Sequence, residues 1–208
     1  MEEKKISEQE SLELITRMIN QTKKDLAVGN GDSFLMWGYL SAAISLAVIV
    51  MLLATNDPRY AWLYMVIPIA GFTASGIKTY KAKRKSHVAS TYASNTINNV
   101  WAIISAVFAV YAISCLLHFG EVRSWNGMFL LGMLLPGIGT YTTGVILKEK
   151  SIQMCGLLGV VIGTGLLRDF VCGEQVISIM QMGQMVLSFV ITLIIPGHIL
   201  NFKAKKQQ

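Results

Sequence analysis

Two hydroxyl side chains at matching places in the chain are the strongest candidates for chemistry. Ser75 and Thr143 each lie seven residues after a proline, Pro68 and Pro136, in segments that are otherwise apolar. Such a hydroxyl can hydrogen-bond a solute, or it can bond back to its own helix and serve only packing. We hypothesise that both hydroxyls face a shared axis, where a small neutral solute would bind. The candidate binding residues are Gly71, Ser75, Gly139 and Thr143.

Catalytic chemistry has no motif in this sequence. The patterns His-Glu-x-x-His, Gly-x-Ser-x-Gly and Gly-x4-Gly-Lys-Ser/Thr do not occur, so zinc hydrolase, serine hydrolase and P-loop activities are not indicated. The apolar stretches contain no Asp or Glu, and intramembrane carboxylates are the usual carriers of proton coupling. We therefore expect neither an enzyme nor a proton-coupled pump, no catalytic residue and no cofactor.

Soft metal ligands occur near the end of the chain. Met180, Met182 and Met185 follow Cys172 closely, and thioether and thiolate sulfurs suit Cu(I). Methionine is also a common filler of apolar surfaces, and this chain has 11 of them. We therefore predict no metal site. The 3 cysteines are too few and too scattered for a disulfide framework or a Cys-x-x-Cys site.

The composition places most of the chain in a lipid bilayer. Of its 208 residues, 53% are hydrophobic and 14% charged, whereas soluble domains carry roughly 25% charged residues. The mean hydropathy is +0.51. The net charge of +6 does not indicate nucleic-acid binding, because the basic residues flank apolar segments instead of covering a folded surface.

Charge-poor windows of helical length predict an all-α integral membrane bundle of six transmembrane helices. The fifth window is the shortest, and a re-entrant segment is the alternative there. That alternative would reverse the last helix and place its basic tail outside, so we interpret the window as a span. The predicted spans are 34–54, 60–77, 100–119, 127–147, 152–169 and 176–200.

The distribution of Lys and Arg predicts the orientation. With the N-terminus inside, only Arg59, Arg123 and Arg168 of the 18 Lys and Arg residues lie outside, as the positive-inside rule requires. We expect a multi-pass protein of the cell membrane with both termini cytoplasmic. The basic cluster after the second span should touch anionic lipid headgroups. It consists of Lys78, Lys81, Lys83, Arg84 and Lys85.

Residues 1–33 form a polar N-terminal segment before the membrane domain at 34–202 and the basic tail at 203–208. Leu12, Ile15 and Ile19 recur at helical spacing, which predicts an amphipathic helix, and Gly29-Asn30-Gly31 should end it. The helix either buries these residues against membrane or bundle, or docks a protein partner.

An internal repeat organises the predicted spans. Pro68-x2-Gly71-x4-Gly76 matches Pro136-x2-Gly139-x4-Gly144, and Trp37-x3-Ser41-Ala42 matches Trp101-x3-Ser105-Ala106. We infer three helical hairpin repeats, with helix kinks at Pro68 and Pro136. Helices four and five are rich in glycine, which predicts close packing within the bundle. Homo-oligomerisation through the face of Gly159 is the alternative.

The sequence therefore favours a non-catalytic accessory, sensor or regulatory membrane protein that acts through partners. The N-terminal helix, the basic cluster and the lack of intramembrane charge support this interpretation. The alternative is a facilitative permease or exporter of a small neutral or apolar solute, which the repeated proline and glycine positions favour. Proline and glycine are frequent in membrane helices in any case, so the accessory hypothesis ranks first.

Overall fold

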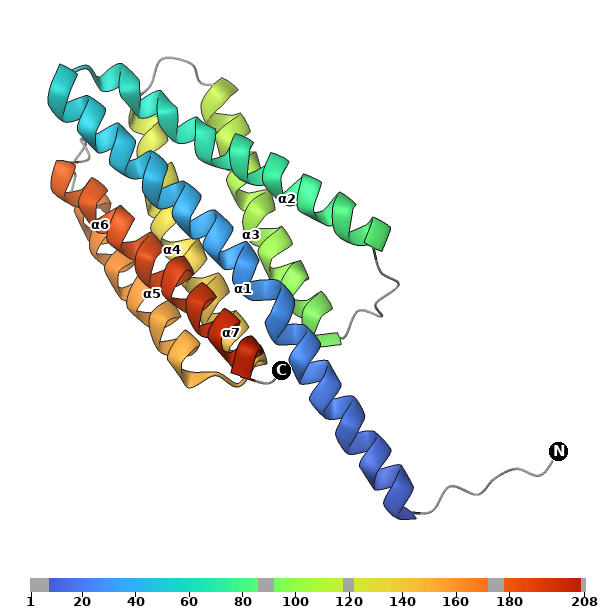
Figure 1. The fold of residues 1–208 in the computed structure, drawn as a ribbon. Coiled ribbons are helices and arrows are strands. Elements are labelled where there is room, and N and C mark those ends of the chain that lie inside the picture. Colours follow the sequence, from blue (N-terminus) through green and yellow to red (C-terminus); the bar gives the residue numbers. More distant parts are fainter. Residues whose placement is uncertain (1–7, 86–91, 118–121, 172–177, 207–208) are drawn as a thin grey trace.

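The computed structural model describes residues 8–85, 92–117, 122–171 and 178–206, and every element within them is helical (Figure 1). The chain folds as an all-α bundle, as predicted. Its elements, in chain order, are α1 (Glu8–Thr55), a 3-10 helix η1 (Pro58–Met65), α2 (Val66–Lys85), α3 (Tyr92–Leu117), α4 (Val122–Ile146), α5 (Lys150–Val171), α6 (Ile179–Phe189), a π-helical turn η2 (Val190–Ile194) and α7 (Ile195–Lys206).

Among the described residues, four helical stretches are long and apolar enough to cross a membrane. They are Gly31–Thr55, Ala93–Leu117, Gly127–Ile146 and Ile179–Lys206, and they correspond to the predicted spans one, three, four and six. Predicted spans two and five are not among these four stretches of described residues. Lysines occupy the second half of α2, and α5 carries Lys150 near one end and Arg168 near the other. A membrane protein follows from the four helices, and the count of six spans stays a prediction.

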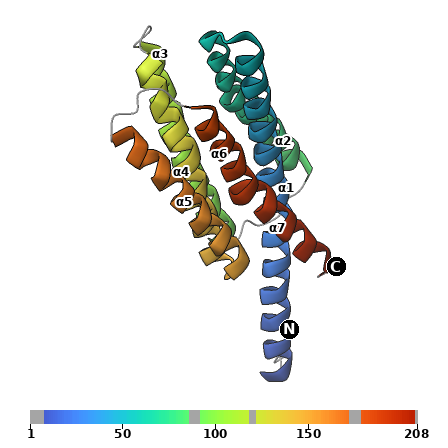
Figure 2. The same ribbon diagram turned by 90° about the vertical axis from the view of Figure 1, so that its left-hand side faces the viewer.

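Helix α1 does not end at Gly29-Asn30-Gly31, so the predicted helix stop is wrong. It continues unbroken for 48 residues from Glu8 to Thr55, and its N-terminal half projects beyond the bundle (Figures 1 and 2). Gly31 does not end the helix; it allows close packing. A Cβ atom there would meet the Asn201 side chain at 2.0 Å and the Gly197 carbonyl at 2.9 Å, so glycine lets α7 approach α1.

The C-terminal helices connect the two sides of the bundle. Figure 2 shows α6 between α1–α2 on one side and α3–α4–α5 on the other, and α7 crossing α1. Apolar side chains from α1, α4, α5, α6, η2 and α7 form the core, which is therefore shared by segments far apart in the sequence. Its buried members are Phe34, Phe129, Met133, Ile152, Met182, Met185, Phe189, Leu193 and Leu200.

Glycines bring α4 and α5 into backbone contact. A Cβ atom on Gly137 would lie 2.9 Å from the Val160 nitrogen, and one on Gly156 would lie 2.3 Å from the Tyr141 nitrogen. Gly159, in turn, faces Thr192 of η2, whose methyl group would lie 2.1 Å from an added Cβ. The predicted close packing within the bundle is confirmed for these glycines, because small residues let helix backbones approach closely.

Pro68 lies at the start of a helix instead of in mid-span. The expected helix at 60–77 is a 3-10 helix from Pro58 to Met65 followed by α2 from Val66. A proline in the first helical turn removes an N–H that has no partner inside the helix, so it fits there at little cost. Pro136, by contrast, lies inside α4.

Candidate functional site

The first candidate hydroxyl, Ser75 of α2, is held by a tryptophan of α1. Trp37 donates its indole Nε1–H to Ser75 Oγ over 3.1 Å. Its ring covers Gly71, where an added Cβ would lie 2.1 Å from the ring, and it meets Phe72 edge to face at 5.6 Å. Gly71 is therefore the residue that lets Trp37 reach Ser75.

The second candidate hydroxyl, Thr143 of α4, has the same partner type. Trp101 of α3 donates its indole Nε1–H to Thr143 Oγ1 over 3.2 Å. Its ring covers Gly139, where a Cβ would meet ring carbons at 3.1 Å and Ile104 at 2.7 Å. Thr143 itself donates to the Gly139 carbonyl at 2.7 Å and is 1% exposed. Both functions of this hydroxyl, donor and acceptor, are thus used within the protein.

One aromatic contact links the two tryptophan sites across the bundle. Phe34, which lies one turn before Trp37 on α1, packs edge to face on Trp101 at 5.2 Å between ring centroids. Each hydroxyl accepts a hydrogen bond from the tryptophan of the helix that precedes it in the chain. Solute binding at Gly71, Ser75, Gly139 and Thr143 stays a prediction.

A further pair of polar residues was not anticipated from the sequence. Thr140 Oγ1 donates to the backbone carbonyl of Thr192 at 2.7 Å, and both side chains are fully buried. In an α-helix the N–H four residues later would donate to that carbonyl, but residue 196 is proline and has none. From the sequence, Pro196 indicates that the Thr192 carbonyl lacks its usual helical donor. Nothing in the sequence indicates that Thr140 supplies a donor instead.

Polar contacts join the helices at the end of the bundle from which α1 projects. Lys78 of the basic cluster donates to Ser33 at 2.9 Å, and Asn201 donates to Asp32 at 2.8 Å. Lys203 forms an ion pair with Glu149 in the α4–α5 turn. Lys78 and Lys81 are exposed, and the side chains of Lys83, Arg84 and Lys85 lie outside the described part. Contact of this cluster with lipid headgroups stays a prediction.

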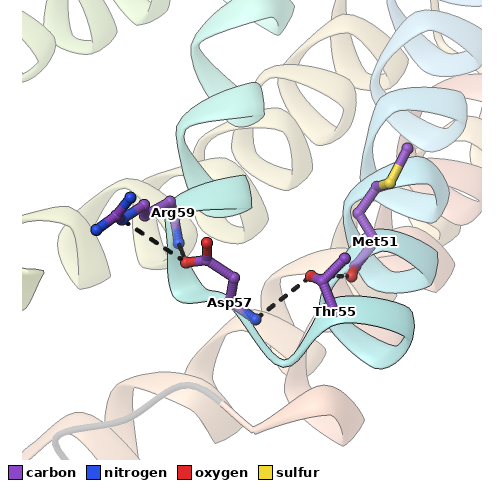
Figure 3. Close-up of polar contacts among 4 residues, drawn as sticks. All are labelled: Met51, Thr55, Asp57 and Arg59. Carbon is purple, nitrogen blue, oxygen red and sulfur yellow. Dashed lines mark hydrogen bonds and ion pairs between the residues drawn. The ribbon is translucent and has the colours of Figure 1, made fainter.

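The turn after α1 is stabilised by local hydrogen bonds (Figure 3). Asn56 adopts a positive φ of 52°, and Asp57 caps η1 by accepting from the backbone N–H of Arg59 at 2.9 Å. Thr55 accepts from the Asp57 N–H at 3.3 Å and donates to the Met51 carbonyl at 2.7 Å. Arg59 lies 4.0 Å from Asp57 and is 90% exposed, so this pair adds little stability.

The methionine group is divided between the surface and the core, and Cys172 lies outside the described residues. Met180 is 76% exposed, whereas Met182 and Met185 are buried in the apolar core with Met133. No group of three or more His, Cys, Asp or Glu side chains that could hold a metal occurs in the described ranges.

Comparison with known proteins adds no assignment. No protein-family model matches the chain, and neither a curated protein nor a solved structure matches it.

Proposed function

We propose that this membrane protein is a non-catalytic accessory, sensor or regulatory subunit that binds its partner through residues 8–30 of α1, here called the N-terminal arm. One observation carries the proposal. The arm and the first membrane-competent stretch, Gly31–Thr55, are a single helix, and the arm extends past the bundle (Figures 1 and 2).

The arm does not use its apolar residues to pack on the bundle where its side chains are described. Leu12 is 65% exposed, so it does not pack on the bundle, and its burial against the membrane stays a prediction. The side chains of Ile15 and Ile19 lie outside the described part. An exposed apolar position on a helix is what an amphipathic docking segment presents. Because a continuous helix is stiff, a partner that moves the helix at Leu12 would also move the part of α1 within the membrane.

The contacts of Ser75 and Thr143 weigh against the permease alternative. Each oxygen already accepts an indole N–H, so a solute would compete with a bond between helices.

Orientation belongs to the same proposal: the arm and α7 with Lys205 are cytoplasmic, because basic residues remain on that side. Labelling a single cysteine at position 205 from outside intact cells should give no product.

Photo-crosslinking tests the proposed docking role. A benzoylphenylalanine at position 12 in the full-length protein in its native membrane should give a discrete protein adduct. The matched control is position 110, since Val110 is equally exposed at 68% but lies on the apolar α3. It should give lipid adducts alone. Lipid adducts alone at both positions would overturn the proposal.

A further inference from the structure

A hydrogen-bonded pair of polar side chains lies on the outside of the bundle, where α1 packs on α7. Tyr39 Oη and His198 Nε2 are 2.8 Å apart, and the two rings meet edge to face at 6.1 Å between centroids. Both side chains are exposed, and both helices belong to membrane-competent stretches. The pair therefore faces the surroundings of the bundle instead of its core.

The Tyr39–His198 bond leaves one donor over, whichever group donates. If the tyrosine O–H donates to Nε2, the neutral imidazole carries its own N–H at Nδ1; if Nε2–H donates, the tyrosine O–H is left. Neither side chain makes another hydrogen bond to the described part of the protein. An exposed donor therefore remains for a molecule outside the bundle.

The pair lies close to the polar end of the bundle. Tyr39 is seven residues from Asp32, about 10 Å along the helix, and His198 is five residues from Lys203, about 8 Å. Both charged residues take part in the contacts that join helices at this end. A polar pair at this distance from charged groups suits the boundary between headgroups and acyl chains, where amphipathic rings prefer to lie.

The exposed face of α7 continues from this pair to a cation. Phe202 follows His198 by four residues and Lys206 follows Phe202 by four, a spacing that keeps side chains on one face. Phe202 is 66% exposed, and the Lys206 ammonium lies 5.9 Å from the centre of its ring. Lys205, seven residues after His198, is exposed on the same side.

Toward the middle of the bundle the same surface is aliphatic. Leu46 and Val50 share the face of Tyr39 on α1, and Ile195 precedes His198 on α7; all three are exposed. The order along the surface is thus aliphatic side chains, a hydrogen-bonding pair, an aromatic ring and ammonium groups. A phospholipid presents the matching groups in the same order: acyl chain, ester carbonyl and phosphate.

The charge of this surface favours an anion. Lys205 and Lys206 form no ion pair with a described residue, whereas the nearby carboxylates already have partners. Glu149 pairs with Lys203, and Asp32 accepts from a side-chain amide of α7. Two ammonium groups are therefore left to attract a phosphate, and each contributes about 1 kcal/mol near an anionic lipid surface.

We propose that the surface formed by Tyr39, His198, Phe202, Lys205 and Lys206, here called the α1–α7 surface, binds one anionic phospholipid. The two lysines contact its phosphate, the donor left over by the tyrosine–histidine pair binds an ester carbonyl, and an acyl chain lies along the aliphatic side chains of α1. This site is separate from the basic cluster of α2, and the inference is independent of the proposed partner binding.

Native mass spectrometry of the full-length protein in detergent tests the site. Dioleoylphosphatidylglycerol should bind more tightly than dioleoylphosphatidylcholine. Lys206→Gln should weaken phosphatidylglycerol binding about fivefold and leave phosphatidylcholine unchanged, as expected for one lysine near an anionic lipid. Tyr39→Phe combined with His198→Phe should weaken both lipids about two- to tenfold, because both lipids carry the ester carbonyl that loses a hydrogen bond.

Lys150→Gln is the matched control, because it removes the same charge from an exposed lysine beside Glu149 at the same end of the bundle. It should leave phosphatidylglycerol binding unchanged. Equal affinity of the parent protein for the two lipids, or equal weakening by Lys206→Gln and Lys150→Gln, would overturn the proposal.

The occupant of the surface in the native membrane is identified by crosslinking. A benzoylphenylalanine at position 202 replaces one exposed aromatic ring with another, and it should give a phospholipid adduct. A protein adduct, whether with another protein or with a second copy of this chain, would show that the α1–α7 surface is a protein interface and would overturn lipid binding there.

Discussion

Trp101 donates its indole N–H to Thr143 across 3.2 Å, and the ring lies over Gly139 in the turn before that threonine. Trp37 has the same relationship to Ser75 and Gly71. In both hairpins an indole needs one small residue to lie on and one hydroxyl to bind. The same sequence positions that suggested a solute site therefore also make an aromatic contact between neighbouring helices.

A double-mutant cycle measures the Trp101–Thr143 bond. Trp101→Phe and Thr143→Val each remove one partner, and we expect a coupling of about 0.5–1.5 kcal/mol, the usual net value of a hydrogen bond. The free energy of unfolding in mixed detergent micelles is the measurement. Thr142→Val serves as the control, since Thr142 bonds only to the Ile138 carbonyl. A coupling no larger than that between Trp101→Phe and Thr142→Val would contradict the assignment.

The second prediction compares two glycines on α2. Gly71→Ala places a methyl group 2.1 Å from the Trp37 ring, so the ring must move and its bond to Ser75 weakens. We expect a loss of about 1–3 kcal/mol in unfolding free energy, typical of overpacking. Gly76→Ala meets nothing within 4 Å and should leave stability unchanged or raise it by up to about 1 kcal/mol, because alanine favours helix. Equal effects at both positions would refute the role of Gly71.

Hydropathy predicted the helical class, and four of the six predicted spans coincide with the membrane-competent stretches. The glycines of helices four and five predicted close packing, because small residues let helix backbones approach closely. Residue spacing did not reveal which side chain contacts each glycine. Gly139 and Thr143 were predicted to share one helix face, but Trp101, which covers them, comes from another helix and is brought there by tertiary packing.

Two further differences have local physical causes. Glycine weakens a helix by about 1 kcal/mol relative to alanine, which is too little to stop α1 at Gly31 where close contact with α7 compensates. A proline removes one backbone hydrogen bond from a helix, but its distance from the helix start decides whether the helix is distorted. Pro68 falls in the first turn of α2, and Pro196 follows a π-helical turn.

The α4–α5 turn gives the third prediction. Helix α4 ends with a pair of bonds, from Glu149 N–H to the Gly144 carbonyl at 2.8 Å and from Lys148 N–H to the Val145 carbonyl at 3.1 Å. Lys148 has a φ of 57°, in the left-handed position that glycine usually fills in this motif. Lys148→Gly should therefore stabilise the protein by about 0.5–1 kcal/mol, because a side chain in this conformation costs energy.

The control for this prediction is Lys150→Gly, at the first residue of α5. This change removes an equal charge but adds a glycine at a helical position, so stability should fall or stay level. Thermal unfolding of both variants in the same detergent compares them. A lower Tm for Lys148→Gly than for Lys150→Gly would show that the left-handed residue carries no strain.

The last prediction concerns the carbonyl of Thr192. Pro196 cannot donate to it, and Thr140 supplies the donor from α4 at 2.7 Å. Thr140→Val keeps the shape of the side chain but leaves a buried carbonyl without that bond, so we expect a loss of about 1–3 kcal/mol in unfolding free energy. The effect should be larger than that of Thr142→Val, whose hydroxyl only duplicates a bond within its own helix.

Pro196→Ala supplies the rescue. Alanine restores an N–H at position 196, four residues after Thr192, so the helix can bond that carbonyl itself and the π-helical turn Val190–Ile194 can relax to an α-helix. In the Pro196→Ala background, Thr140→Val should cost clearly less than in the parent protein. Unfolding free energies of the four proteins give the coupling directly, and equal costs of Thr140→Val in both backgrounds would mean that Thr140 does not replace the proline's missing donor.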